Sequence, residues 1–130
     1  MLELTGIHHA AIICSDYPAS RRFYVEILGL RVIAETWRAS RQSWKLDLQL
    51  PDGAGIELFA FPNPPLRPTY PEARGLRHLA FRVPDLDAAV AYLKSRQIQV
   101  EPIRQDSITS KRFTFFTDPD ELPLELYEDR

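Results

Sequence analysis

The chain has 130 residues, of which 45% are hydrophobic and 26% are charged, and its formal net charge is −2. These values are typical of a small folded protein and argue against long disordered segments. The near-neutral charge removes the electrostatic argument for nucleic-acid binding, and no apolar run approaches the ~20 residues that a membrane span requires. The single cysteine, Cys14, excludes an intrachain disulfide and fits a reducing compartment. We therefore expect a cytoplasmic protein without a nucleic-acid or membrane partner.

The first half of the chain is predicted to form one strand, one helix and three further strands. An apolar stretch at about 4–13 predicts the first strand. Ser15 and Asp16 are the candidate N-caps of the helix, Pro18 lies in its first turn, and Gly29 ends it. Apolar and polar residues then alternate, which is typical of strands with one buried face. These strands are predicted at about 31–38, 44–50 and 55–61.

A proline-rich linker at 61–74 separates this half from the next. Five prolines lie between positions 61 and 71, and they disfavour a regular helix or a central strand. After the linker, a strand is predicted at about 76–83, and Asp85 is the candidate N-cap of a second helix. The remaining strands are predicted at about 98–104, 111–117 and 123–128.

The two halves of the chain repeat each other. The segment Gly6–Ile12 aligns with Gly75–Phe81, and Gly55–Phe59 aligns with Pro123–Tyr127. Each half therefore has the order βαβββ, which predicts an α+β fold with the helices on one face of mostly antiparallel sheets. The predicted single domain spans 1–130, with module one at 1–60, the linker at 61–74 and module two at 75–130.

Four residues of metal-ligand type occupy matching positions in this repeat. Successive side chains of a strand point to opposite faces, so each of these residues faces away from its apolar neighbours. A carboxylate among apolar residues is costly to bury unless it is paired or bound to a cation. Two imidazoles and two carboxylates without cysteine suit Ni²⁺, Zn²⁺, Co²⁺, Mn²⁺ or Fe²⁺. The predicted ligands of one divalent metal ion are His9, Glu57, His78 and Glu125.

The case for a metal rests on the repeat, because a lone histidine or glutamate on a strand is usually an ordinary polar residue. His8 is expected on the opposite face from His9 and aligns with Arg77, so we interpret it as a structural or rim residue. Four nitrogen and oxygen ligands without sulfur predict an octahedral site that leaves two positions for water or substrate. No organic cofactor is expected.

The chain resembles the vicinal oxygen chelate superfamily, which includes glyoxalase I, bleomycin-resistance proteins and extradiol dioxygenases. The resemblance spans nearly the whole chain and implies an eight-stranded cup around one metal, with both βαβββ modules contributing. The family's ligand positions map onto the four predicted ligands. One departure is Glu121, where the family usually has glycine. The segments that carry the resemblance are Ile7–Ile12, Phe23–Leu30, Gly55–Phe59, Leu76–Phe81, Phe116–Asp120 and Leu124–Leu126.

Within the superfamily, this ligand set is most similar to that of bacterial glyoxalase I. The resemblance implies a lyase or isomerase reaction on a small oxygenated substrate, in which the metal stabilises an enediolate and a carboxylate moves a proton between adjacent carbons. Glu125 or Glu57 is the implied base, with Glu125 preferred. The glutathione-binding residues of the family have no clear counterparts, since the only asparagine, Asn63, lies in the linker.

Other functions remain open at this point. An extradiol-type dioxygenase would use His9, His78 and Glu125 on Fe²⁺, although Glu57 would then occupy a position needed for substrate and dioxygen. A metal-dependent thiol transferase or epimerase could use the same residues. A drug-sequestering protein of the bleomycin-resistance type needs no metal, which the complete ligand set disfavours.

Several other residues could contribute to substrate binding. Basic residues could hold a carboxylate or phosphate, and strand aromatics could wall a pocket. Open sheet edges also favour a homodimer. The candidate basic residues are Arg38, Arg41, Lys45 and Arg112, and the candidate aromatic residues are Trp37, Trp44, Phe113 and Phe115.

Overall fold

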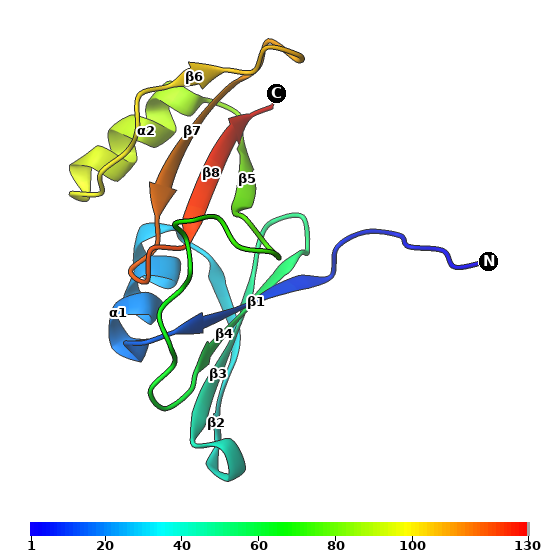
Figure 1. Ribbon diagram of the computed structural model, residues 1–130, viewed down its shortest axis with the longest axis vertical. Coiled ribbons are helices and arrows are strands. Elements are labelled where there is room, and N and C mark those ends of the chain that lie inside the picture. The colour runs from blue at the N-terminus through cyan, green and yellow to red at the C-terminus, as the bar shows by residue number, and fades with distance from the viewer. Residues whose placement is uncertain (130) are drawn as a thin grey trace. The chain divides into compact units, whose positions relative to one another are not determined.

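The computed structural model describes residues 1–129, and the chain divides into two compact units, Met1–Pro65 and Leu66–Arg130. We call them unit 1 and unit 2. Each unit contains one four-stranded sheet with a helix against one of its faces (Figure 1). This arrangement confirms the predicted α+β class and the two tandem βαβββ modules. The closure of the eight strands into one cup stays a prediction.

The sheet of unit 1 has the strand order β1-β4-β3-β2. Strands β1 and β4 are parallel, whereas β4 with β3 and β3 with β2 are antiparallel. The sheet is therefore mostly antiparallel, as predicted, with one parallel pair that the helical connection after β1 makes possible. The strands are β1 (His9–Cys14), β2 (Arg31–Arg38), β3 (Ser43–Gln49) and β4 (Gly55–Ala60), and a short 3-10 turn, η2 (Ala39–Arg41), connects β2 to β3.

The helix of unit 1 is α1 (Tyr17–Arg22), which continues into the π-helical turn η1 (Phe23–Ile27). Asp16 is the N-cap, and its side chain accepts a hydrogen bond from the backbone N–H of Ala19 at 3.1 Å. Gly29 has a φ of 75°, which lets the chain reverse after the helix. The helical segment packs on the sheet through buried apolar residues, which include Tyr24, Leu46, Leu48, Ile56 and Leu58.

Unit 2 repeats this topology, with the strand order β5-β8-β7-β6. Its helix, α2 (Leu86–Ser95), is capped by Asp85, whose side chain accepts from the N–H of Ala88 at 3.0 Å. The buried face contains residues from the helix and the strands, including Leu86, Val90, Leu93, Phe116 and Leu124. The strands are β5 (Leu79–Val83), β6 (Arg104–Gln105), β7 (Arg112–Thr117) and β8 (Pro123–Glu128).

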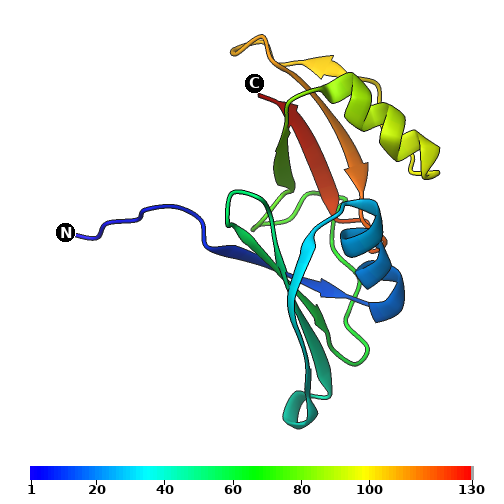
Figure 2. The same ribbon diagram turned by 180° about the vertical axis from the view of Figure 1, so that it is seen from behind.

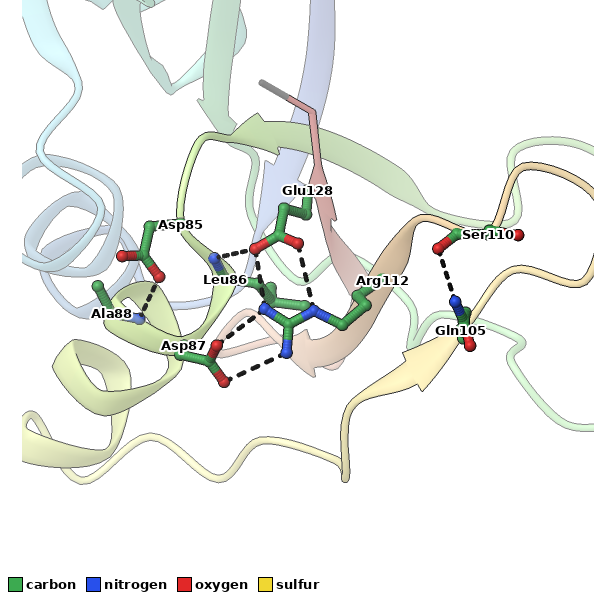
Figure 3. A network of polar contacts seen from close by, with 8 residues as sticks. All are labelled: Asp85, Leu86, Asp87, Ala88, Gln105, Ser110, Arg112 and Glu128. Carbon is green, nitrogen blue, oxygen red and sulfur yellow. Dashed lines mark hydrogen bonds and ion pairs between the residues drawn. The ribbon is translucent and has the colours of Figure 1, made fainter.

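An ion-pair network attaches α2 to its sheet (Figure 3). Arg112 donates to both oxygens of Glu128, at 3.2 and 3.0 Å, and also contacts Asp87 at 2.8 Å. Glu128 accepts a further hydrogen bond from the backbone N–H of Leu86 at 2.9 Å. These partners raise the pKa of Arg112, with Glu128 contributing most. Arg112 is therefore structural, and the hypothesis that it binds substrate is wrong.

Three predicted strand boundaries need correction. Strand β1 begins at His9 rather than near residue 4, because its parallel partner β4 begins at Gly55, directly opposite His9. The chain before His8 extends away from the sheet (Figure 1 and Figure 2). Strand β5 likewise begins at Leu79, since β8 begins at Pro123.

The strand predicted at 98–104 reduces to the two-residue β6. Pro102 has no N–H to give to a ladder, so regular pairing is interrupted there. Among residues 1–129, no helix is long and apolar enough to cross a membrane.

Candidate functional site

The first pair of predicted ligands comes together in unit 1. His9 is the first residue of β1, and Glu57 lies in the neighbouring β4, opposite Ala11. The Nε2 atom of His9 lies 3.4 Å from Oε2 of Glu57. Both side chains project from the sheet face opposite the buried Ile56 and Leu58, as the period-2 argument predicts. We call these two residues the unit 1 pair.

The second pair comes together in the same way in unit 2. His78 directly precedes β5, and Glu125 lies in β8, opposite Ala80. The Nε2 atom of His78 lies 3.6 Å from Oε1 of Glu125. The ring of Phe115 meets the His78 ring edge-on, with 5.0 Å between their centroids. We call His78 and Glu125 the unit 2 pair.

The geometry of each pair fits two ligands of one divalent ion. Metal–nitrogen and metal–oxygen bonds of about 2.0–2.2 Å place neighbouring ligand atoms about 2.8 to 3.6 Å apart, with octahedral angles at the short end and tetrahedral angles at the long end. The observed separations of 3.4 and 3.6 Å lie at the long end of this range, and they are long for a direct hydrogen bond. The carboxylates are mostly buried, with 20% of the Glu57 side chain and 14% of the Glu125 side chain exposed. A cation would offset the cost of burying them.

Each unit brings together half of the predicted ligand set. Within residues 1–129, no group of three or more histidine, cysteine, aspartate or glutamate side chains is placed to hold a metal ion. The structure describes the two units individually, so the sharing of one ion by both pairs stays a prediction.

His8 lies beside His9 rather than on the opposite face. Its Nδ1 atom is 2.8 Å from Nδ1 of His9, and the two rings meet edge-on. The alternation rule does not apply here, because His8 precedes the first strand residue. When Nδ1 of His9 donates this hydrogen bond, Nε2 keeps the lone pair that a metal needs. This contact fits the structural role predicted for His8, whereas the prediction that His8 lies on the opposite face from His9 is wrong.

Charged side chains surround Glu57 in unit 1. Strand β3 pairs with β4 so that Asp47 lies opposite Glu57. Lys45 contacts both carboxylates, with its Nζ 3.4 Å from Asp47 and 3.9 Å from Oε1 of Glu57. One oxygen of Glu57 therefore faces His9 while the other faces a cation.

Aromatic side chains surround the pair in unit 2. A hollow of about 1000 Å³ opens beside it, and we call this the unit 2 hollow. Its lining includes His78, Glu125, Phe113 and Phe115, together with Arg104 of β6. Most residues of the segment 67–74, which the sequence assigns to the linker, form part of its wall. A pocket of this size accommodates a small organic ligand.

The predicted substrate-binding residues divide into two groups. Phe113 and Phe115 line the unit 2 hollow, as expected. Trp44 instead stacks on Tyr17 of α1, with 5.4 Å between centroids, and Trp37 packs on Trp44. Trp44 therefore lies on the helix side of its sheet, and neither tryptophan is among the residues that line the unit 2 hollow. Burial, followed by a hydrogen bond to Glu35, raises the pKa of Tyr17.

Two of the candidate basic residues lie on rings next to the unit 1 pair. The guanidinium of Arg38 is 4.8 Å from the centroid of Phe59, and that of Arg41 is 5.4 Å from the centroid of Phe61. Arg104 was not among the predicted substrate-binding residues, and it lies opposite Phe113 in the β6–β7 ladder. Alternation along β7, followed back through the turn that precedes it, could have identified Arg104, because a residue opposite Phe113 shares that face.

Comparisons with known proteins agree on one family for this chain. A family model described as Glyoxalase/Bleomycin resistance protein/Dioxygenase superfamily matches residues 6–126. The Bacillus subtilis protein YwkD, described as uncharacterized, is 62% identical over 125 residues, covering 96% of this chain and 98% of its own length.

Solved structures agree with this assignment. A glyoxalase family protein from Enterococcus faecalis is 48% identical, with a TM-score of 0.90 over 95% of this chain and 98% of that one. A fosfomycin resistance protein from Listeria monocytogenes, solved with Mn(II) and 1S,2S-dihydroxypropylphosphonic acid, has a TM-score of 0.76 at 19% identity. It covers 98% of this chain and 96% of its own, and it shows the shared fold.

Proposed function

The chain belongs to the Glyoxalase/Bleomycin resistance protein/Dioxygenase superfamily, and from this premise we propose that it is a divalent-metal-dependent lyase or isomerase of the glyoxalase I type. The reaction moves a proton between adjacent carbons of a small oxygenated substrate. The observation that carries this proposal is the duplicated histidine–glutamate pair, at 3.4 Å in unit 1 and 3.6 Å in unit 2. The fold of this superfamily accommodates divalent metal, as the Mn(II)-bound fosfomycin resistance protein illustrates.

The residues that would hold the metal are His9, Glu57, His78 and Glu125. A divalent ion bound there would stabilise negative charge on the substrate oxygens while a neighbouring carbon loses its proton. The imidazoles bind through Nε2, which faces the carboxylate in both pairs. Without cysteine among the ligands, ligand type favours no single first-row ion.

Glu125 is the proposed base. It lines the unit 2 hollow, where a substrate carbon can approach its carboxylate. Glu57 is less suited, because its Oε1 atom faces the Lys45 ammonium group, 3.9 Å away, and Glu57 is not among the residues that line the unit 2 hollow. Glu125 would take the proton from one carbon and return it to the adjacent one, so that no oxidant or reductant is consumed.

The hollow's walls would exclude water and orient the substrate. Phe113 and Phe115 provide apolar surface beside His78 and Glu125. Excluding water strengthens the electrostatic interactions of a charged substrate with the residues around it.

Proton transfer can be tested without knowing the natural substrate. The protein is loaded separately with Ni²⁺, Zn²⁺, Mn²⁺ and Fe²⁺ and incubated in D₂O with small 2-oxo aldehydes and 2-hydroxy acids, including methylglyoxal with glutathione. NMR then detects deuterium on the two adjacent oxygen-bearing carbons between which the proton moves. We expect metal-dependent exchange, reduced about 10²–10⁴-fold in Glu125→Gln. The control Glu121→Gln removes a charge from the hollow outside the proposed metal ligands and should retain exchange.

Two results would contradict this proposal. The first is no exchange with any metal on the whole panel. The second is oxygen consumption with a catechol in the Fe²⁺ protein, without proton exchange on the panel, because this identifies an extradiol-type dioxygenase. Metal content is measured for every variant, so that loss of the base is distinguished from loss of the ion.

A further inference from the structure

Arg104 is held over two aromatic rings of the unit 2 hollow. Its guanidinium carbon lies 5.1 Å from the centroid of Phe113 and 5.4 Å from that of Phe115. Cations at this distance from a ring face are attracted to it, which restricts where the side chain can point. The guanidinium is thereby fixed on the sheet face that also carries Glu125, which lies opposite Phe115 in the β7–β8 ladder.

We propose that the unit 2 hollow binds a small anionic substrate, with Arg104 as the residue that recognises its negative group. The near end of this substrate carries the hydroxyl or carbonyl oxygens that the proposed function requires. The far end carries a carboxylate, phosphate or phosphonate. The near-end assignment rests on the proposed function, whereas the anion-binding role of Arg104 is independent of it.

The spacing of the groups sets the size of the substrate. Phe115 contacts the His78 ring at a centroid distance of 5.0 Å, and Arg104 lies 5.4 Å from the centroid of the same Phe115 ring. A single aromatic ring therefore connects the histidine of the unit 2 pair to the guanidinium. The two centroid distances limit the separation of the imidazole ring from the guanidinium carbon to about 10 Å, which a small substrate with polar groups at both ends can span.

Arg104 is able to exchange its present partner for a ligand. It forms an ion pair with Glu101 at 3.0 Å, but both side chains are 55% exposed and only three residues apart. Exposed pairs of this kind contribute little to stability. A carboxylate or phosphonate can replace Glu101 and accept two parallel hydrogen bonds from the guanidinium fork.

The rest of the lining also favours an anion. Its four arginines and four glutamates balance, so that a divalent cation at Glu125 would make the hollow positive. Two polar atoms of the loop that lines it, Arg67 Nε and Thr69 Oγ1, are buried without a hydrogen-bond partner among the described residues. Both groups can donate to a ligand oxygen. The charged lining residues are Arg67, Arg74, Arg77, Arg104, Glu72, Glu101, Glu121 and Glu125.

The matching face of unit 1 also carries a stacked arginine, because the guanidinium of Arg38 lies 4.8 Å from the centroid of Phe59. The strand register differs, since Asp47 lies opposite Glu57 where Phe115 lies opposite Glu125 in unit 2. A second carboxylate beside Glu57 repels an anion. Unit 2 has an aromatic ring at this position, so we assign the anion site to unit 2.

Three related probes test the proposal in the metal-loaded protein. All three probes share a hydroxy-acid end and differ at the distal end. Malate carries a distal carboxylate, and 3-phosphonolactate carries a distal phosphonate. The third probe is the derivative of malate whose distal carboxylate is replaced by a neutral amide. Calorimetric titration should show that the wild type binds one or both of the anions about tenfold more tightly than the amide. Arg104→Gln should lower this preference to less than about twofold.

The matched control is Arg82→Gln. Arg82 also lies in the sheet of unit 2 and forms an exposed ion pair, with Asp129 at 3.0 Å, but it is not among the residues that line the hollow. It should keep the full preference. Equal affinity of the wild type for malate, 3-phosphonolactate and the amide would overturn the proposal, as would an undiminished preference in Arg104→Gln.

A second measurement separates this proposal from the proposed function. Inorganic phosphate is added to chelator-treated protein, and the side-chain Nε–Hε signal of Arg104 is followed by NMR. We expect a saturable shift that Arg82→Gln retains. An unchanged signal overturns the anion site whether or not the protein binds metal. A clear shift in a protein that binds no metal supports the anion site and overturns the proposed function alone.

Discussion

The two histidine–glutamate pairs occupy matching positions, yet their surroundings differ. In unit 1, His8 contacts the histidine and Lys45 contacts the carboxylate. In unit 2, an aromatic ring contacts the histidine, and the hollow opens beside the carboxylate. The pair itself is the common element of the repeat.

This difference separates two roles of the proposed metal site, which are holding the ion and binding the substrate. A ligand pair needs only two strands in fixed register, which both units supply through the β1–β4 and β5–β8 pairings. The side chains around it determine what else can bind. Unit 1 therefore presents charged groups beside its pair, whereas unit 2 presents a cavity lined by aromatic rings and four arginine side chains.

The largest predicted effect is on metal affinity, and it concerns the hydrogen bond between His8 and His9 in unit 1. His8→Ala removes the Nδ1 partner of His9 and should weaken metal binding about 10–100-fold, as loss of outer-shell hydrogen bonds does in other metal sites. The residue at the equivalent position of unit 2 is Arg77, whose side chain pairs with Glu72 at 3.3 Å. Arg77→Ala should therefore leave the affinity unchanged. Competition against a fluorescent chelator measures both, and equal effects of the two variants would contradict the asymmetry.

A second difference concerns how each helix is attached. Glu128 in unit 2 accepts from Arg112 and from the N–H of Leu86, and only 14% of its side chain is exposed. Glu128→Ala should lower the free energy of unfolding by about 1–3 kcal/mol, because it leaves buried donors unpaired. Asp87→Ala removes the other, 70% exposed partner of Arg112 and should cost less than about 1 kcal/mol. Urea unfolding measures both losses. A larger loss in Asp87→Ala than in Glu128→Ala would show that Asp87 contributes more to holding the helix on the sheet.

The smallest effect is expected at the corresponding attachment in unit 1. Hydrogen bonds from Tyr17, and then from Arg21, lower the pKa of Glu35. A lowered carboxyl pKa stabilises the fold above the ordinary glutamate value of about 4.3, and this contribution disappears as the pH falls through the folded-state pKa. Glu35→Gln should therefore lower Tm at pH 7, by an amount corresponding to less than about 1 kcal/mol, and this deficit should shrink towards pH 3.

The control for this titration is Glu26→Gln in the same unit. It removes the same charge from a longer and more exposed ion pair, 3.9 Å from Arg22. A Tm deficit of Glu35→Gln that stays constant from pH 7 to pH 3 would show that the carboxylate charge is not what stabilises this contact.

The sequence predicted the elements well where one strand face is buried. Alternation of Leu46 and Leu48 with Lys45 and Asp47 identified β3 and the face of each residue. The same rule paired His9 with Glu57 and His78 with Glu125, because the residues alternate relative to buried neighbours. The helix N-caps at Asp16 and Asp85 followed from residue type and position.

The errors occur where local patterns do not determine the environment. Apolar residues 4–7 resemble a strand, but β4 begins too late to pair with them. Arg112 and Trp44 carry side chains suited to a binding site, yet each lies on the face that packs against a helix. The role of Arg104 depends on two rings from β7 that approach it only after folding. Periodicity therefore identified the ligand pairs but not the hollow beside them.

The most direct test of the central claim is the number of metal ions per chain in wild type, His9→Ala and His78→Ala. We propose that both pairs bind the same ion, so equilibrium dialysis with elemental analysis should give one tightly bound ion per wild-type chain and close to none in either variant. Two ions per wild-type chain, or one ion retained after loss of either histidine, would contradict it.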